Sequence, residues 1–242
     1  RREMGTLGKD VAQGLAQSLD LKVIHSELVE HDLAERLGVQ ESAVHHYLEG
    51  NASLLERWKI DKNKLSQYTA QEILEFAQAG NVIIRGWGAV AVLRAIPHVL
   101  RVRVCAPMPF RERVIMDRLG LKDPDAARSE IEKSDAAHAR LMRSFFGVNW
   151  ENPQLYHISL NTSCVPVATC VRAVRLLTDD PAFAENETSR GMLADKLIEA
   201  KVRAVARAFA DDTGSGSITN VSVTSGHVEL SGIFGPGVDV DT

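Results

Sequence analysis

The segment Gly5-Thr6-Leu7-Gly8-Lys9-Asp10 stands directly before an amphipathic helix whose apolar residues are Val11, Ala12, Leu15, Ala16 and Leu19. A glycine-rich turn that leads into a helix directs backbone N–H groups and the positive end of the helix dipole at one point, which is how proteins bind phosphate. The phosphate-loop pattern G-x-x-x-x-G-K-[ST] is half met, because Glu3 replaces the first glycine and Asp10 replaces the hydroxyl residue that binds Mg²⁺. The segment predicts a nucleotide site, with a glycine turn and a solvated lysine as the open alternative.

Composition favours an ordinary protein with one sizeable core and a small appendage. The 242 residues are 45% hydrophobic and 25% charged, with a net charge of -4, which argues against a nucleic-acid partner. Cys105, Cys164 and Cys170 are odd in number and lack C-x-x-C spacing, so we expect reduced thiols. The apolar stretch at 89–93 is too short to span a membrane and no signal peptide opens the chain. We therefore expect a cytoplasmic protein without a transmembrane segment.

Apolar spacing predicts strands that alternate with helices, and hence an α/β fold with a parallel sheet covered by helices on both faces. Ser26 is the expected N-cap of the second helix, and Thr69 with Glu72 forms an expected capping box for a helix that ends at Gly80. A phosphate loop normally follows a buried strand, so we expect that a first strand is missing before Arg1. The expected strands lie at 21–24, 82–84, 102–105 and 156–160, and the other expected helices at 26–37, 42–58 and 165–177.

Arginine recurs at helical spacings between Pro109 and Phe146. Arg111, Arg113 and Arg118 share one expected helix, and Asp123 is the expected cap of a second helix. Two such helices could form a cationic lid over transferring phosphates, because phosphoryl transfer requires mainly positioning and charge neutralisation. Solvated ion pairs within the second helix remain the alternative. That helix carries Arg128, Glu132, Lys133, Asp135, Arg140 and Arg143.

Gly86-Trp87-Gly88 follows an expected strand and should lie at the carboxyl edge of the sheet, where ligands of open α/β folds bind. Trp87 could stack on a base or fill the crevice. His45 and His46 have no carboxylate or cysteine at a ligand spacing, so a metal site built by protein side chains is not expected.

The ordered motifs together resemble the cytidylate-kinase-like family over about residues 1–177. They are the segment 2–10, Gly86-Trp87-Gly88-Ala89, the stretch 106–118, and Phe145-Phe146-Gly147-Val148-Asn149-Trp150 with Leu160-Asn161-Thr162. The resemblance implies a P-loop nucleoside-monophosphate kinase fold that uses ATP and Mg²⁺ and phosphorylates a pyrimidine nucleotide such as CMP or dCMP. It implies catalytic roles for Lys9, Arg113 and Arg118. It places the donor nucleotide on Gly5, Thr6, Leu7, Gly8, Lys9, Asp10 and Thr162, and the acceptor near His25, Arg85, Trp87, Asp135 and Arg140.

Departures from the family pattern motivate a second hypothesis. The pair His25-Ser26 replaces a charged pair, and Trp87 stands where the family tends to have arginine, with Arg85 displaced by two positions. A nucleotide-sensing regulatory or scaffold protein with weak catalysis is therefore the alternative function. Neither the acceptor base nor the oligomeric state follows from these patterns.

The composition changes after Thr178, which predicts three parts: a kinase-like domain at 1–178, a linker at 179–189 and a small α+β domain at 190–242. The last part resembles a BON-type domain, with a helix and an alternating hairpin that turns at Ser225-Gly226. The resemblance implies a protein or lipid partner. The Gly/Ser stretch at 214–217 predicts loose attachment to the core.

Overall fold

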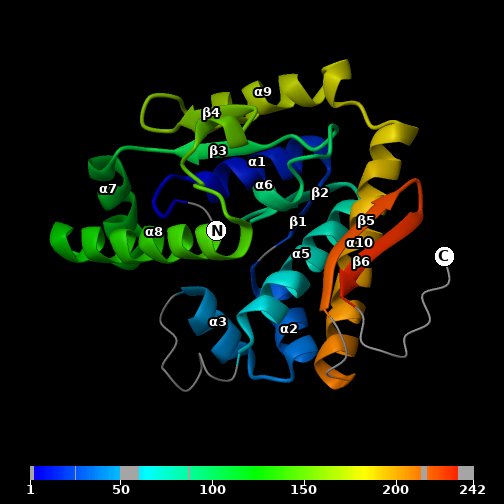
Figure 1. The fold of residues 1–242 in the computed structure, drawn as a ribbon. Coiled ribbons are helices and arrows are strands. Elements are labelled where there is room, and N and C mark those ends of the chain that lie inside the picture. Colours follow the sequence, from blue (N-terminus) through cyan, green and yellow to red (C-terminus); the bar gives the residue numbers. More distant parts are fainter. Residues whose placement is uncertain (1–2, 25, 50–59, 87, 214–216, 234–242) are drawn as a thin grey trace.

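The structure is a computed structural model that describes residues 3–24, 26–49, 60–86, 88–213 and 217–233. Its elements alternate between helices and short strands (Figure 1). The strands are β1 (Lys22–Ile24), β2 (Val82–Ile84), β3 (Val102–Cys105), β4 (Ile158–Asn161), β5 (Ser217–Thr224) and β6 (His227–Ile233). The helices of four or more residues are α1 (Gly8–Leu19), α2 (Ser26–Leu37), α3 (Glu41–Glu49), α5 (Lys62–Ala79), α6 (Ala89–Val92), α7 (Met108–Leu119), α8 (Pro124–Phe146), α9 (Val167–Thr178) and α10 (Glu187–Thr213).

The strands among the described residues form three separate pairs. β1 lies parallel to β2 with Val23 opposite Ile83, and β3 lies parallel to β4 with Val104 opposite Leu160. β5 and β6 form an antiparallel hairpin at the far end of the chain, as expected from their alternation. The alternation of strands and helices thus correctly predicts the parallel pairs.

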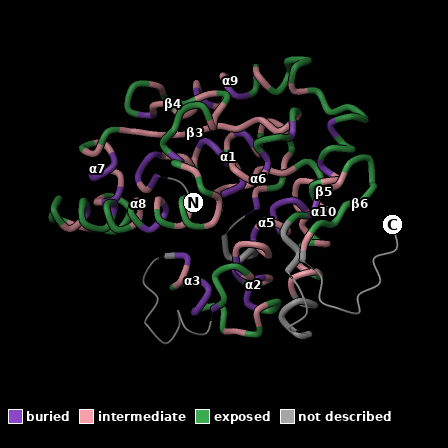
Figure 2. The backbone as a smooth tube through the Cα atoms, viewed as in Figure 1, coloured by how far each residue is buried: buried purple, intermediate pink, exposed green. Residues whose placement is uncertain are grey.

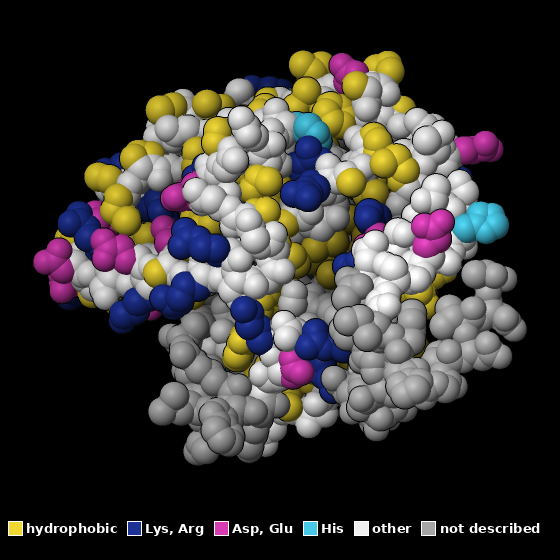
Figure 3. All heavy atoms as spheres, in the orientation of Figure 1, with side chains coloured by type: hydrophobic (Ala, Val, Ile, Leu, Met, Phe, Trp, Pro, Cys, Tyr) yellow, Lys and Arg dark blue, Asp and Glu magenta, His cyan; other side chains and the backbone are white. Residues whose placement is uncertain are grey.

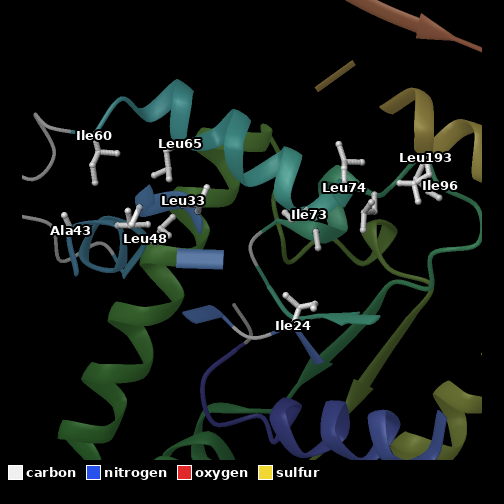
Figure 4. Close-up of a cluster of buried hydrophobic side chains, with 14 residues drawn as sticks. Ile24, Leu33, Ala43, Leu48, Ile60, Leu65, Ile73, Leu74, Ile96 and Leu193 are labelled. Atoms are coloured by element: carbon white, nitrogen blue, oxygen red, sulfur yellow. The ribbon is translucent and has the colours of Figure 1, made fainter. Parts of the chain in front are cut away.

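Most of the buried apolar surface lies in a cluster between α2, α3, α5 and α6 (Figure 4). Leu33, Leu65 and Ile73 are fully enclosed there. A second cluster joins α1 to α9 and to the β3–β4 pair through Val11, Leu15, Leu160, Cys170 and Val174. The buried segments of the backbone lie where the elements pack together, and the segments that face outward are exposed (Figure 2). None of the described helices is long and apolar enough to cross a membrane.

The expected capping box at Thr69 is wrong. Helix α5 begins earlier, at Lys62, and its cap is Asp61, whose carboxylate accepts hydrogen bonds from the N–H groups of Asn63 and Lys64. Thr69 is buried inside the helix and donates to the carbonyl of Leu65. Glu72 forms an ion pair with Arg36 of α2, and burial raises the pKa of its carboxyl group despite that partner. Thr69 and Glu72, whose spacing predicts the start of a helix, therefore lie inside α5, where they are buried.

Helix α10 is firmly packed on the core, which differs from the loose attachment expected from composition. Leu193 is buried within the main apolar cluster, and Leu197 and Ala200 pack against it. Lys201 of the same helix lies 3.3 Å from Glu75 of α5. The hairpin is attached to α10 in turn, because Asp195 accepts hydrogen bonds from the N–H groups that follow β5.

Removal of residues 179–242 is therefore expected to destabilise the remaining chain. The truncation removes Leu193 from the main apolar cluster, and a buried leucine contributes about 2–5 kcal/mol in comparable cores. Thermal unfolding followed by circular dichroism would show a clearly lower midpoint than that of the full chain. A form that ends after Ile233, and so keeps α10 and the hairpin, is the matched control. Equal midpoints for the full chain and the form ending at Thr178 would contradict a shared core.

Candidate functional site

The loop before α1 forms a tight turn around two residues with positive φ. Gly5 has φ 80° and Leu7 has φ 55°, and Leu7 is the N-cap of α1. The carbonyl of Leu7 accepts hydrogen bonds from the N–H groups of Asp10 and Val11, whereas Lys9 is exposed at the start of the helix. Within the part of the chain that the structure describes, Lys9 has no ion-pair partner. The loop thus presents a free ammonium beside a helix N-terminus, which suits an anionic ligand.

The loop is tied to the sheet by two buried threonines. Thr6 donates to the carbonyl of Glu3 at 2.8 Å. Thr162, which follows β4, donates to the carbonyl of Thr6 at 2.8 Å. Thr162 therefore lies against the loop and binds its backbone.

Glu3 lies at the start of this loop and is 6% exposed. Its carboxylate accepts a hydrogen bond at 2.6 Å from Arg103 of β3, and the same guanidinium lies 5.1 Å from the ring centre of Trp150. Burial lowers the pKa of Arg103, but the hydrogen bond and charge of Glu3 outweigh this effect and raise the pKa overall. Glu3, which breaks the phosphate-loop pattern, thus fixes the loop to the strand.

Helix α7 is in direct contact with the loop. A Cβ atom at Gly5 would lie 2.6 Å from the carbonyl oxygen of Arg111, so this position admits only glycine without a shift of the helix. Arg111 donates from Nε to the carbonyl of Met4 at 2.7 Å. The same guanidinium binds both carboxylate oxygens of Asp135 on α8, at 2.8 Å each. Arg111 therefore joins the loop, α7 and α8.

A second ion pair connects the far end of α7 to α1. Arg118 donates to the carboxylate of Asp10 at 2.7 Å, and both side chains are partly exposed. Asp10 is the residue at the position where a phosphate loop has a Mg²⁺-binding hydroxyl. Arg118, an arginine of the expected lid, therefore lies next to the loop, and its guanidinium is paired with the carboxylate of Asp10.

The structure selects between the arginines of α7. Arg113 is exposed and lies over the ring of Phe110, with 5.9 Å between its guanidinium carbon and the ring centre. Residues two apart on a helix differ by about 200°, whereas residues seven apart share a face. Arg111 and Arg118 accordingly both face the loop, and Arg113 does not. The missed residue is Arg111, and its seven-residue spacing from Arg118 is the signal that could have identified it.

In α8, the second arginine-rich helix, charged side chains form ion pairs with α7 as well as within α8. Arg128 pairs with Glu112 of α7 at 2.6 Å, and Asp135 pairs with Arg111. Lys133 pairs with Glu130 one turn away within α8, at 3.3 Å. Asp123 caps the helix as expected, by accepting from the N–H of Asp125. The charges therefore hold α7 and α8 together.

Asp135 and Arg140 lie in different surroundings. Arg140 is exposed and borders a hollow of about 610 Å³ between α8, Tyr47 and the start of α5, together with Lys62 and Arg143. Figure 3 shows basic side chains gathered along α8 on this face. The structure does not bring Arg140 into contact with the loop or with Asp135.

Arg85, another expected acceptor residue, directly follows β2. Arg85 is half-buried beside the glycine turn, and a Cβ atom at Gly88 would collide with the ring of Phe146. Gly88 is therefore needed for the close approach of α8 to this turn. His25 and Trp87 lie outside the described residues.

The fold and the site define a helix-rich α/β protein with parallel strand pairs and a glycine loop at a helix N-terminus, which is consistent with a kinase-like fold. Residues 1–164 match the profile of the family described as "Cytidylate kinase-like family". The chain belongs to this cytidylate kinase-like family.

Similar proteins include cytidylate kinases from Pyrobaculum species. Those of Pyrobaculum calidifontis and Pyrobaculum aerophilum are each 26% identical to this chain, over 67% of this chain and 81% of the relative. The cytidylate kinase of Pyrobaculum neutrophilum is 24% identical with the same coverage. A crystal structure of an uncharacterized protein from Eubacterium ventriosum superposes with a TM-score of 0.55 and 17% identity. It covers 74% of this chain and 95% of that chain, and it supports the fold alone.

Proposed function

We propose that this protein transfers a phosphoryl group from ATP to a nucleoside monophosphate, with CMP or dCMP as the preferred acceptor. The observation that carries the proposal is the exposed Lys9 at the N-terminus of α1, on a loop fixed by Thr6, Thr162 and Gly5. Family membership and the cytidylate kinase relatives support the same reaction class.

Lys9 and the N–H groups at the start of α1 would hold the donor phosphates, because both supply positive charge at one point. Arg118 would leave Asp10 and move to the phosphates when they bind, since a doubly charged phosphate attracts a guanidinium more strongly than one carboxylate does. Arg111 of α7 binds both the loop and α8, and it would hold these two helices, the expected lid, in place beside the phosphates. The acceptor would lie toward Arg85, Asp135 and Arg140, as the family resemblance implies.

Mg²⁺ would neutralise charge on the transferring phosphates. This ion is usually bound by one or two carboxylates together with substrate phosphates and water. Among the described residues, no group of three acidic, histidine or cysteine side chains could hold a metal by itself. Asp10 offers a carboxylate beside the loop, and it fits this partial role once Arg118 has moved away.

A nucleotide sensor with weak catalysis is the second candidate function. The ion pair between Asp10 and Arg118 favours it, because the pair engages the lid arginine and the loop carboxylate with each other. The two candidates differ in turnover and share nucleotide binding. The helix α10 with its hairpin would serve as a partner-binding module in either case.

ADP formation measured against a panel of nucleoside monophosphates tests the proposal. A kinase would show ADP formation that depends on the acceptor and is fastest with CMP or dCMP. Nucleotide binding by calorimetry with no acceptor-dependent ADP formation would favour the sensor instead. Absence of both binding and turnover would contradict each candidate.

Replacement of Arg118 by alanine is expected to reduce kcat by about 10- to 100-fold with a smaller change in ATP affinity, because its charge would act mainly in the transition state. Arg113→Ala is the matched control, since Arg113 lies on the opposite face of the same helix and contacts Phe110. The measurement is steady-state kinetics with both substrates varied. Equal losses in the two variants would indicate a general effect of charge on α7 and would contradict a specific role for Arg118.

A further inference from the structure

The glycine loop contains a buried negative charge close to the place where donor phosphates would bind. Glu3 is buried and lies two residues before Gly5, so the Cα atoms of these residues are at most about 7 Å apart. This separation is shorter than the Debye length of about 8 Å at physiological ionic strength, and a buried charge is screened less than an exposed one. An unpaired carboxylate at this position would therefore repel a phosphate on the loop.

Arg103 of β3 holds this carboxylate with two of its N–H groups. Nε and Nη2 both donate to Oε1 of Glu3, at 3.0 and 2.6 Å, and Nη1 donates to the carbonyl of Glu151 at 2.8 Å. The guanidinium carbon lies 5.1 Å from the ring centre of Trp150, and the carbonyl of Trp150 accepts a hydrogen bond from the Tyr156 hydroxyl at 2.6 Å. The guanidinium is thus fixed by partners on several sides, and its side chain is mostly out of water.

Glu3 and Arg103 affect their titratable neighbours with opposite signs. Burial raises the pKa of the Cys105 thiol at the end of β3, the charge of Glu3 raises this pKa further, and the charge of Arg103 lowers it. Burial also raises the pKa of the Tyr156 hydroxyl, where the charge of Arg103 again opposes that of Glu3. The negative charge of Glu3 thus acts beyond its own hydrogen bonds, and Arg103 offsets it at two separate groups.

The other cations beside the loop leave one positive charge available. Arg111 and Arg118 of α7 are each paired with a carboxylate, whereas Lys9 has no ion-pair partner in the described part of the chain. Among the same residues, Arg103 is the cation that pairs with Glu3. Without Arg103, the carboxylate of Glu3 would therefore oppose the ammonium of Lys9 at the loop.

We propose that Arg103 is a positioning residue for the donor phosphates, which acts through Glu3 by neutralising its charge and holding it against β3. The loop then presents the charge of Lys9 to the phosphates without an opposing carboxylate. The inference rests on the nucleotide binding that both candidate functions share, and it extends the proposed function to a residue that acts on the ligand only through Glu3. It differs from a purely structural attachment of the loop, because the benefit of the Arg103 charge depends on the charge of Glu3.

Calorimetric titration of the full chain with ATP tests this dependence through the variants Arg103→Met, Glu3→Gln and the double variant. Arg103→Met is expected to weaken ATP binding by about 10-fold or more, because it leaves a buried carboxylate without its partner. Glu3→Gln should tighten ATP binding by about 2- to 5-fold, because the charge of Arg103 is then no longer offset. The double variant, which lacks both charges, should return to within about 3-fold of the unaltered chain.

A purely structural attachment predicts a different pattern. Each single variant would break the same hydrogen bonds, so both would lose affinity and the double variant would recover none of it, and this result would overturn the proposal. The loss in Arg103→Met should also be larger for ATP than for ADP and should shrink at high salt, as electrostatic repulsion requires. A loss that is equal for the two nucleotides and independent of salt would overturn the proposal as well.

The exposed ion pair between Glu185 and Arg190 provides a matched control. Glu185→Gln, Arg190→Met and their double variant should each keep the ATP affinity within about 2-fold, because an exposed pair is well screened. Thermal unfolding followed by circular dichroism accompanies every titration. If Arg103→Met does not fold, Glu3→Gln still decides the question, since neutralisation predicts a gain in affinity and structural attachment predicts a loss.

ADP formation is measured separately from ATP binding. ATP binding without acceptor-dependent ADP formation would contradict the kinase, and the affinities of the three variants would still decide the role of Arg103. Absence of ATP binding by the unaltered chain would overturn both the proposed function and this inference.

Discussion

Replacement of Lys9 by alanine is expected to weaken ATP binding by about 10- to 100-fold, and to reduce turnover by at least as much. A hydrogen bond from an ammonium to phosphate contributes about 1.5–3 kcal/mol, and the loss of this charge-assisted bond corresponds to that range. The helix N-terminus that remains supplies about 0.3–1 kcal/mol where it is solvated. Residual binding should therefore be weak and strongly dependent on salt.

Isothermal titration calorimetry with ATP measures this effect directly. Lys196→Ala on α10 is the matched control. Lys196 is a partly exposed lysine that pairs with Glu199 on the same helix, and it lies far from Lys9 in the sequence. Lys9→Arg should retain part of the affinity, since it keeps the charge and changes its geometry. Unchanged ATP affinity in Lys9→Ala would show that the loop is an ordinary glycine turn.

Replacement of Arg111 by methionine is expected to lower the free energy of unfolding by about 3 kcal/mol. The substitution removes both bonds to Asp135 and the bond to the Met4 carbonyl, and it leaves a partly buried carboxylate without its partner. Because α7 is held on the Gly5 loop through this residue, kcat/KM should fall as well. Urea unfolding followed by circular dichroism gives the stability.

The double variant Arg111→Met with Asp135→Leu separates the loss of stability from the fall in kcat/KM. Removal of the orphaned carboxylate should restore part of the stability, whereas the loop would still lack the bond to Met4 and activity should stay low. Arg113→Met is a surface control, because Arg113 is exposed on the opposite face of the same helix and contacts Phe110. Wild-type stability in Arg111→Met would contradict the joining role of this side chain.

The sequence predicts the elements well where a periodic apolar pattern meets a clear end signal. The cap at Asp123, the parallel strands at 82–84 and 102–105 and the glycine turn before α1 are examples. It fails where residues act across the fold. Thr69 and Glu72 have the spacing of a helix start, but their partners are Leu65 and Arg36, and the second lies on another helix.

In the candidate site, too, local features could be predicted from the sequence, whereas contacts between distant elements could not. Gly5 lies in the loop and Thr162, at the end of a strand, contacts it, whereas their expected binding of the donor nucleotide stays a prediction. The family resemblance implies a catalytic role for Arg113 in place of Arg111, although the seven-residue spacing of Arg111 from Arg118 puts these two on one face; that this face packs against the loop is decided by tertiary contacts. Arg140 is separated from Asp135 for the same reason, because five helical residues turn its side chain to another neighbour.

The position of the hairpin on α10 has a consequence for signal transmission. The turn between β5 and β6 is bonded to Asp195, and Leu193 and Leu197, which flank Asp195 in sequence, contact the core. The hairpin tip and the core thus meet on one turn of helix, a rise of about 5.4 Å. A partner bound at this tip would act on the core through a rigid helical turn, so its binding would be communicated without passing through the Gly/Ser stretch at 214–217.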